Sequence, residues 1–338
     1  MKKLFLTMVA LVVATMSYAQ NSLLATLSHD GDITTFYGAS ALKQAHEAAE
    51  HGDVITLSSG TFTSTDITKA ITLRGAGWKF DVANHKEPTI LSGDFTINIP
   101  ETVDQRLTIE GIYHNSMIYY KKINNAKFVK NRFKTINYYN SESRFNNVEF
   151  IQCIIFSYFF VNGLCSATCI NCFVSGPKHI DTTTSNCEYI NCILAKDEDF
   201  SVIRSSQLTN CILVTEGVIY PLPSSVSAFN CLCVAMNSIY NCFSNIPNST
   251  NKTVLFSETP FENCDDYNMM GLDDETFELT DEAKAKYLGT DGTEIGMYGG
   301  MLPFSSTTTN PQITKCNVAA KSTADGKLSV DIEVSSAE

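Results

Sequence analysis

The sequence predicts an all-β fold in which short parallel strands stack into a solenoid. Three observations indicate this: an Asn-Cys dipeptide that recurs about every 20 residues, short β-rich runs around it, and no helical periodicity within the repeat. A unit this short cannot enclose its own core, so successive units must stack. The chain of 338 residues is 44% hydrophobic and 18% charged, which suits a long column with a continuous core.

The first residues predict export. Lys2 and Lys3 precede an apolar stretch from Leu4 to Val13, and small residues follow at Ser17 to Ala19. We assign residues 1–19 to a signal peptide and expect an exported protein that is periplasmic, on the cell surface or extracellular. No later stretch reaches about 18 uninterrupted apolar residues, so we expect no membrane span.

The charge balance limits the partners. The chain has 24 basic and 36 acidic residues and a formal net charge of −12. This excess of negative charge disfavours nucleic acid, and it repels polyanionic glycans unless a local basic patch overrides it. We expect a monomer without a cofactor, whose possible partner is a polysaccharide or a cell-surface component.

The repeat places like residues in columns. Equivalent residues of neighbouring coils lie ~4.8 Å apart, so an Asn at each turn can bond to the Asn above and below, while Cys serves as a small hydrophobe inside. Upstream, the cysteine column continues to Asn131 and then Gly111. The predicted structural ladder comprises Asn171, Asn191, Asn210 and Asn230 together with Cys153, Cys172, Cys192, Cys211 and Cys231.

A stacked column exposes its core at both ends and needs caps. Residues Ser40 to His51 predict a short N-terminal capping helix, with Ser40 as N-cap and Gly52 as terminator. Residues Thr280 to Tyr287 predict a second short helix.

These elements divide the chain. Residues 20–304 form the predicted parallel β-helix domain with its caps, and residues 305–338 form a linker and a C-terminal β-hairpin-like tail. The strands of that tail are expected at Ile313 to Val318 and Lys327 to Val334, around a turn at Asp325-Gly326.

Segments at both ends resemble a known superfamily. The runs Gly52 to Phe62, Ile71 to Gly77 and Thr89 to Gly93 resemble the opening coils of the pectin-lyase-like superfamily, and Asp291 to Gly300 is similar to the Gly-rich sequence that closes such domains in exported bacterial proteins. The resemblance implies a right-handed parallel β-helix. It implies no single activity, because the superfamily includes lyases, hydrolases, epimerases, adhesins and non-catalytic modules.

Twelve cysteines in an exported protein raise the question of disulfides. Cysteines stacked in register point the same way, whereas a disulfide needs a torsion near ~90°, so we expect mostly free, buried thiols. No metal site is expected, because tetrahedral zinc would pull the ladder cysteines out of the repeat. If disulfides form, we expect them to involve Cys165, Cys187, Cys233 and Cys316.

Basic side chains are the candidates for lyase chemistry, which needs a base and a cation beside the uronate carboxylate. One group is Lys130 and Arg132 on a single strand, with Arg144 in the next coil. The other group pairs His179 with Asp199, one period later, near Arg204. Solvated surface charges are the alternative interpretation of both groups. The Gly-His-Gly segment of polygalacturonase-type hydrolases is missing. The catalytic candidates are Lys130, Arg132, Arg144, His179, Asp199 and Arg204.

Paired tyrosines offer a route to glycan contact, because sugar rings stack on aromatic faces. Tyr119 and Tyr120 precede Tyr138 and Tyr139 by one period, so we expect Tyr119 near Tyr138 and Tyr120 near Tyr139. One member of each pair should face outward. The alternative is that these rings cover the core at a turn.

The preferred hypothesis is an exported, non-catalytic β-helix protein that binds a glycan or another cell-surface component along the side of the column. A solenoid repeats each surface position every ~4.8 Å, which suits extended polymers. The alternatives are a polysaccharide lyase or glycoside hydrolase, and a structural stalk or adhesin segment.

Overall fold

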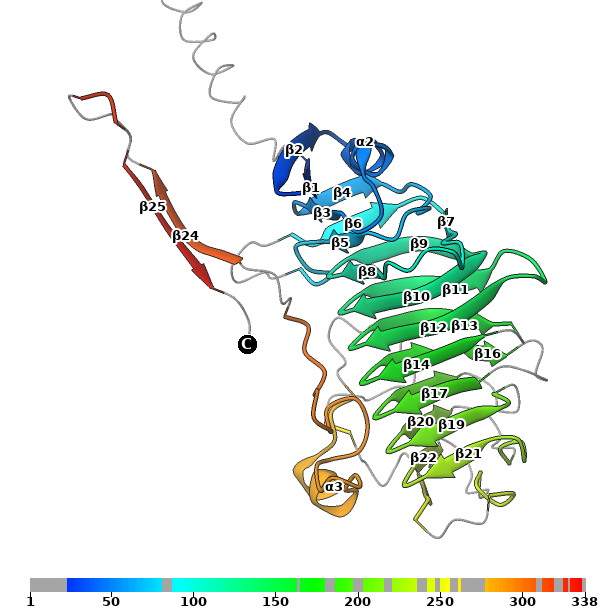
Figure 1. The fold of residues 1–338 in the computed structure, drawn as a ribbon. Helices are drawn as coiled ribbons and strands as arrows, with labels where there is room; N and C mark the ends of the chain where they lie inside the picture. The colour runs from blue at the N-terminus through cyan, green and yellow to red at the C-terminus, as the bar shows by residue number, and fades with distance from the viewer. Residues whose placement is uncertain are drawn as a thin grey trace, which may run out of the picture.

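The protein is an all-β parallel solenoid of about eight turns, as the repeat predicts (Figure 1). The computed structural model describes residues 23–80, 87–162, 165–179, 186–196, 203–215, 221–235, 242–246, 250–255, 261–262, 277–307, 312–318, 325–327 and 329–335. The predicted signal peptide lies outside these residues.

One long side of the column is sheet A. Its strands pair in parallel from β3 onward, and the antiparallel pair β2 and β1 extends it at the N-terminal end. In sheet order the strands are β2 (Asp32–Tyr37), β1 (Leu24–His29), β3 (Val54–Leu57), β5 (Thr72–Arg74), β8 (Leu107–Glu110), β10 (Lys122–Val129), β12 (Arg144–Ile151), β14 (Ser166–Ile170), β17 (Asn186–Ile190), β19 (Ser206–Thr209) and β21 (Ser227–Phe229).

The other long side is sheet B, which is parallel throughout. In sheet order its strands are β23 (Lys252–Leu255), β22 (Leu232–Ala235), β20 (Ile212–Thr215), β18 (Ile193–Lys196), β15 (Phe173–Ser175), β13 (Ile154–Val161), β11 (Arg132–Tyr138), β9 (Tyr113–Tyr120), β6 (Thr89–Ser92) and β4 (Gly60–Thr63). Two short strands, β16 (Pro177–His179) and β7 (Phe95–Ile97), pair with β13 and β9.

A helix and the β1/β2 pair close the N-terminal end (Figure 1). Helix α2 (Ala41–Ala48) buries Ala41, Leu42 and Ala45, which confirms the predicted capping helix. It ends before His51, and Ser40 occupies the N-cap position without a capping side-chain hydrogen bond.

Each coil turns from sheet A to sheet B through a corner. The first residue of this corner adopts the left-handed backbone conformation. The φ angle is 50° at Asn171, 49° at Asn191 and 53° at both Asn210 and Asn230. Asn tolerates this conformation better than other non-glycine residues, so backbone geometry explains its recurrence. Gly111, with φ of 67°, also occupies this corner position, which corrects its predicted place in the cysteine column.

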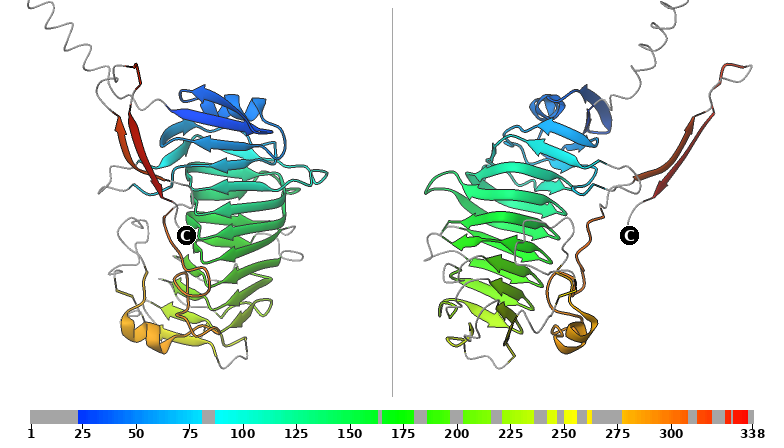
Figure 2. Two further views of the ribbon diagram at one scale, coloured as in Figure 1. Left: turned by 60° about the vertical axis from the view of Figure 1, so that its left-hand side comes forward. Right: turned by 180° about the vertical axis from the view of Figure 1, so that it is seen from behind.

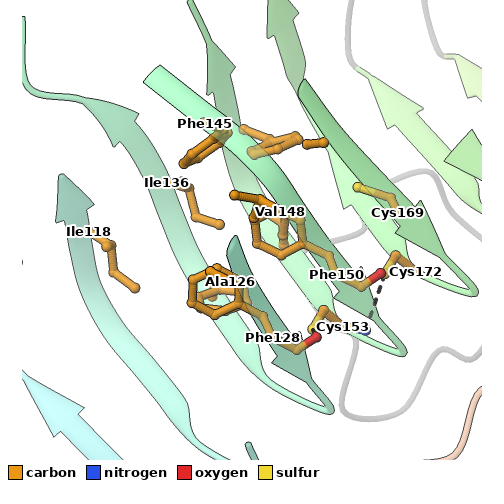
Figure 3. Close-up of a cluster of buried hydrophobic side chains, with 14 of the residues drawn as sticks. Ile118, Ala126, Phe128, Ile136, Phe145, Val148, Phe150, Cys153, Cys169 and Cys172 are labelled. Atoms are coloured by element: carbon orange, nitrogen blue, oxygen red, sulfur yellow. Dashed lines mark hydrogen bonds between the residues drawn. The ribbon is translucent and has the colours of Figure 1, made fainter. Parts of the chain in front are cut away.

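The second corner residue points inward and forms the cysteine column. Cys172, Cys192 and Cys211 are fully buried and lie in register on successive coils, as predicted. The Cys172 thiol donates to the carbonyls of Phe150 and Ile170, both at 3.3 Å, and accepts from the Cys153 amide (Figure 3). Each thiol therefore satisfies backbone groups at the corner.

The cysteines whose side chains the structure describes are free and buried, including Cys165, Cys187 and Cys233. The side chain of Cys316 lies outside the described part of the chain. The prediction of mostly free thiols is confirmed for the described cysteines.

Aromatic rings fill part of the interior (Figure 3). Phe128 and Phe150, on neighbouring coils, stack with centroids 4.9 Å apart. Phe133 meets Phe128 edge to face at 5.7 Å from the opposite sheet. The interior thus contains ladders of like side chains, as repeated packing requires.

A second apolar layer covers the outer face of sheet B. Here the outward residues of successive strands, including Phe173, Ile193 and Ile212, pack against residues from 277–304, including Phe277 and Met297. Helix α3 (Asp281–Lys286) belongs to this cover and confirms the second predicted helix, with Thr280 Oγ1 accepting from the Ala283 amide. Strands such as β20 and β22 are consequently buried on both faces.

Residues 288–307, here called the strap, run along the corner column towards the N-terminal coils (Figure 2). Asn171 Nδ2 donates to the carbonyls of Met297 (2.8 Å) and Gly299 (2.6 Å). The Gly-rich segment therefore lies along the side of the column. Further corner contacts follow in order: Asn230 to Leu288, Asn210 to Thr290, Gln152 to Leu302 and Pro303, and Lys130 to Thr307.

The strap modifies the predicted asparagine ladder. Asn230 Nδ2 does donate to Asn210 Oδ1 at 2.9 Å, which is the expected contact between neighbouring coils. Asn171 instead uses its amide on the strap. Beyond the strap, β24 (Gln312–Val318) and β25 (Val330–Ser335) form a separate antiparallel pair (Figure 1).

Candidate functional site

The four predicted tyrosines lie where β9 and β11 end. In these parallel strands Tyr120 is in register with Tyr138, and Tyr119 is in register with Asn137. The predicted pairing was therefore wrong by one residue. The cause is an irregularity between Phe133 and Thr135, where the register of β11 against β9 shifts by one position.

Tyr120 belongs to the core, so it is not on the surface where a glycan could bind. Its ring is fully buried against Phe145, with centroids 3.9 Å apart. Its hydroxyl donates to the carbonyl of Phe160 at 3.1 Å and accepts from the Asn162 amide at 3.0 Å. Burial raises the pKa of this phenol. Tyr138 also packs partly against the core.

Tyr119 and Tyr139 form the outward pair. Their rings meet edge to face, with centroids 6.3 Å apart, and 53% of Tyr139 is exposed. The Lys121 ammonium lies 4.1 Å from the Tyr139 ring centroid, a cation–π contact. Two aromatic rings and a cation therefore converge on one corner of the column.

A tight turn fixes Tyr139. The buried Ser143 hydroxyl accepts from the amides of Tyr139 (3.0 Å) and Asn140 (2.9 Å). The Tyr139 amide also lies 2.9 Å from the Tyr120 carbonyl of the preceding coil. Since the backbone of this exposed residue is held at several points, its ring is presented by a preorganised turn.

The aromatic surface continues onto β13. Tyr158 is 40% exposed, and its ring centroid lies 5.4 Å from that of Phe160. Gly176 lies directly against Tyr158, since an added Cβ would come within 2.9 Å of the Tyr158 ring. Spacing could not have found this extension, because β13 pairs with β11 so that Tyr158 lies opposite Thr135 and Phe159 opposite Ile136, not opposite Tyr139. We define the aromatic face as Tyr119, Asn137, Tyr139, Tyr158 and Phe160.

Arg144 lies beside the aromatic face and away from the other basic candidates. Its Nε is 2.6 Å from Glu101 Oε1, and its amide donates to the Lys121 carbonyl at 2.9 Å. Lys130 lies past the other end of sheet A, eight residues beyond Lys122, the register partner of Arg144, and so about 26 Å away at ~3.3 Å per strand residue. The structure therefore does not bring the predicted Lys130 to Arg144 patch together.

Lys130 is held by the strap, and Arg132 lies among aromatic rings on sheet B. Lys130 Nζ donates to the Thr307 carbonyl at 2.6 Å, and burial lowers the pKa of this lysine. The Arg132 guanidinium lies 5.0 Å from the Tyr113 ring and 4.9 Å from the Phe156 ring. Both side chains are more than nine-tenths buried, so in this structure a polymer on the surface would not reach them.

The second catalytic group is only partly described. The His179 side chain and the whole of Asp199 lie outside the described residues, so their predicted contact stays a prediction. Arg204 is exposed, and its carbonyl accepts from the Ser206 hydroxyl at 3.1 Å.

Neither a metal-binding cluster nor a membrane-spanning helix is present among the described residues. No group of three or more His, Cys, Asp or Glu side chains able to hold a metal ion was found among them. Within the same residues, no helix has the length and apolar character needed to cross a membrane.

Comparison of the chain with protein-family models, with curated proteins and with solved structures gave no significant match. The class that the fold defines is therefore that of a parallel β-solenoid repeat protein.

Proposed function

We propose that this is an exported, non-catalytic parallel β-helix protein that binds an extended glycan through the aromatic face. The observation that carries the proposal is the convergence of Tyr119, Tyr139 and Lys121 on a turn held by Ser143. Aromatic faces stack on the apolar faces of sugar rings, and amide or ammonium groups bind the hydroxyls at their edges.

Adjacent coils supply the length that an extended polymer needs. Tyr119 lies on β9, Tyr139 directly follows β11, and Tyr158 and Phe160 lie on β13. These strands are consecutive in sheet B, so the aromatic face spans three coils at ~4.8 Å each. A chain lying along the column axis would pass Tyr119, Asn137 and Phe160, with Tyr139 and Tyr158 to either side of that line.

The binding test uses the full chain and a panel of soluble neutral and acidic polysaccharides, with affinity measured by isothermal titration calorimetry. The double variant Tyr119→Ala/Tyr139→Ala should lose at least about tenfold in affinity, since each stacked ring contributes on the order of 1 kcal/mol. Tyr37→Ala is the matched control, because Tyr37 is exposed on β2 at the N-terminal end. Equal binding by all three proteins would refute the proposal.

The enzyme alternative is tested on the same samples. Release of unsaturated products or new reducing ends by the wild-type chain, lost in Arg144→Ala, would replace the binding function with catalysis. Arg144 is the relevant residue because it is the basic candidate that lies beside the aromatic face.

A further inference from the structure

A row of aliphatic side chains remains on the outer face of sheet A. Val129, Ile151, Ile170 and Ile190 are in register on four successive strands and are each partly exposed. Thr209 and Phe229 continue the row. Parallel strands with aliphatic residues on both faces are normally covered on both faces.

The strap widens this row into a patch. Leu302 follows Met301 on the strap, and its carbonyl accepts from Gln152, the neighbour of Ile151. Met301 is 94% exposed and Leu302 is 51% exposed. We call the aliphatic row and these strap residues the apolar edge. A contiguous exposed apolar patch on a soluble protein indicates an interaction surface.

Charges next to the row define what fits there. Two residues before each aliphatic residue, a polar row runs in register through Lys127, Glu149, Thr168 and Glu188. We propose that the apolar edge is the interface of a two-fold symmetric dimer, in which Lys127 of each copy pairs with Glu188 of the other.

The register of this dimer follows from the charges. With the two-fold axis between the coils of Glu149 and Thr168, Lys127 meets Glu188 twice and Glu149 meets Thr168. A shift by one coil in either direction places Glu149 against Glu188 or against its own copy. Glu149 already pairs with Arg106 of its own chain at 2.8 Å, so the register is favoured by the two Lys127–Glu188 pairs, which both shifted registers lose.

The aliphatic contacts agree with the same register. Val129 of one copy would meet Ile190 of the other, and Ile151 would meet Ile170, so the apolar row is covered along its middle. This interface lies on sheet A, whereas the aromatic face lies on sheet B. The inference is therefore independent of the proposed function and departs from the monomer expected from the sequence.

Charge reversal tests the dimer. Sedimentation equilibrium of the full chain at micromolar concentrations should give a dimer, and Lys127→Glu or Glu188→Lys alone should weaken it about tenfold or more. The double variant Lys127→Glu/Glu188→Lys should restore the wild-type dissociation constant to within about threefold. Lys134→Glu, on the exposed side of sheet B, is the control and should have no effect.

A wild-type chain that stays monomeric at all concentrations overturns the inference, including the case in which its own β24/β25 pair covers the apolar edge. A dimer that ignores both single reversals, or that the double variant fails to restore, overturns it as well. Circular dichroism of each variant shows whether a loss of dimer reflects a loss of fold.

Discussion

Asn131 and Cys153 occupy equivalent positions on neighbouring coils and donate to equivalent backbone carbonyls. Asn131 Nδ2 donates to Ile109 (2.7 Å) and Val129 (3.1 Å), and Cys153 Sγ donates to Phe128 and Ile151, both at 3.4 Å. Ile109 and Phe128 are themselves in register. The cysteine column is thus a column of hydrogen-bonding side chains in which amide and thiol are interchangeable.

This equivalence predicts the effect of substitutions in the column. Cys153→Asn should change the free energy of unfolding by less than about 1 kcal/mol, because the new amide can make the bonds that Asn131 makes. Cys153→Leu should cost about 1–3 kcal/mol, because it overpacks the corner and bonds to neither carbonyl. Urea denaturation measures both. If Asn were as disruptive as Leu, the two positions would not be equivalent.

The strap should detach when its contact with the corner is blocked. Gly300 has φ of 78°, and an added Cβ would lie 1.9 Å from Asn191 Nδ2. Gly300→Ala should therefore raise hydrogen exchange across residues 295–304 while β9 to β13 stay protected. Gly292→Ala is the control, since Gly292 also has positive φ but no atom within 4 Å of the added Cβ. Equal exchange in both variants would show that close packing at Gly300 does not hold the strap.

The buried histidines should make the fold sensitive to acid. Burial lowers the pKa of His114 to about 3 and that of His46 to about 4, so both are neutral in the folded protein near pH 7. In the unfolded chain both histidines bind a proton near pH 6.5. The stability that the fold gains from keeping them neutral is therefore complete above that pH and is lost as pH falls towards their pKa values in the folded protein. Between pH 7 and pH 5, protonation of His114 in the unfolded chain should by itself lower the free energy of unfolding by about 2 kcal/mol.

His114→Phe tests this assignment. His114 stacks on Phe133 with centroids 4.7 Å apart, and a phenyl ring can keep that contact without a proton to bind. The variant should therefore lose less stability between pH 7 and pH 5 than the wild type, as measured by urea denaturation at each pH. An unchanged pH dependence would mean that other groups cause it.

Glycan affinity should depend on the glycine beneath Tyr158. Gly176 has φ of 52°, and an added Cβ would lie 2.7 Å from the Ser157 carbonyl and 2.9 Å from the Tyr158 ring. Gly176→Ala should displace that ring and weaken glycan binding about threefold or more. Gly93→Ala adds a Cβ at positive φ in open space and should leave affinity unchanged. Equal affinities would place Tyr158 outside the binding surface.

The sequence predicted the column because one coil position demands a left-handed residue and the next demands a small inward one. That rule identifies Asn171 and Cys172 from their spacing alone. The alignment of Gly111 with the cysteine column was wrong, because Gly111 occupies the left-handed position and Ile112 occupies the inward one next to Asn131.

The candidate site was less predictable, because its geometry depends on departures from the repeat. The register shift in β11 changed the partner of Tyr119, and the Ser143 turn set the direction of Tyr139. The burial of Lys130 depends on the strap, which lies outside the repeat and contacts residues far away in the sequence. Arg132 is covered by aromatic rings, one of which, Trp78, meets Phe304 of the strap. Such contacts cannot be inferred from the spacing of residues in the repeat.

The most direct test of the functional account is hydrogen exchange of the full chain with and without the polysaccharide that binds best. Slower exchange is expected only in residues 115–121, 137–143 and 156–161, with no change along the strap. Protection elsewhere, or none at saturating glycan, would contradict the assignment of the aromatic face as the binding surface.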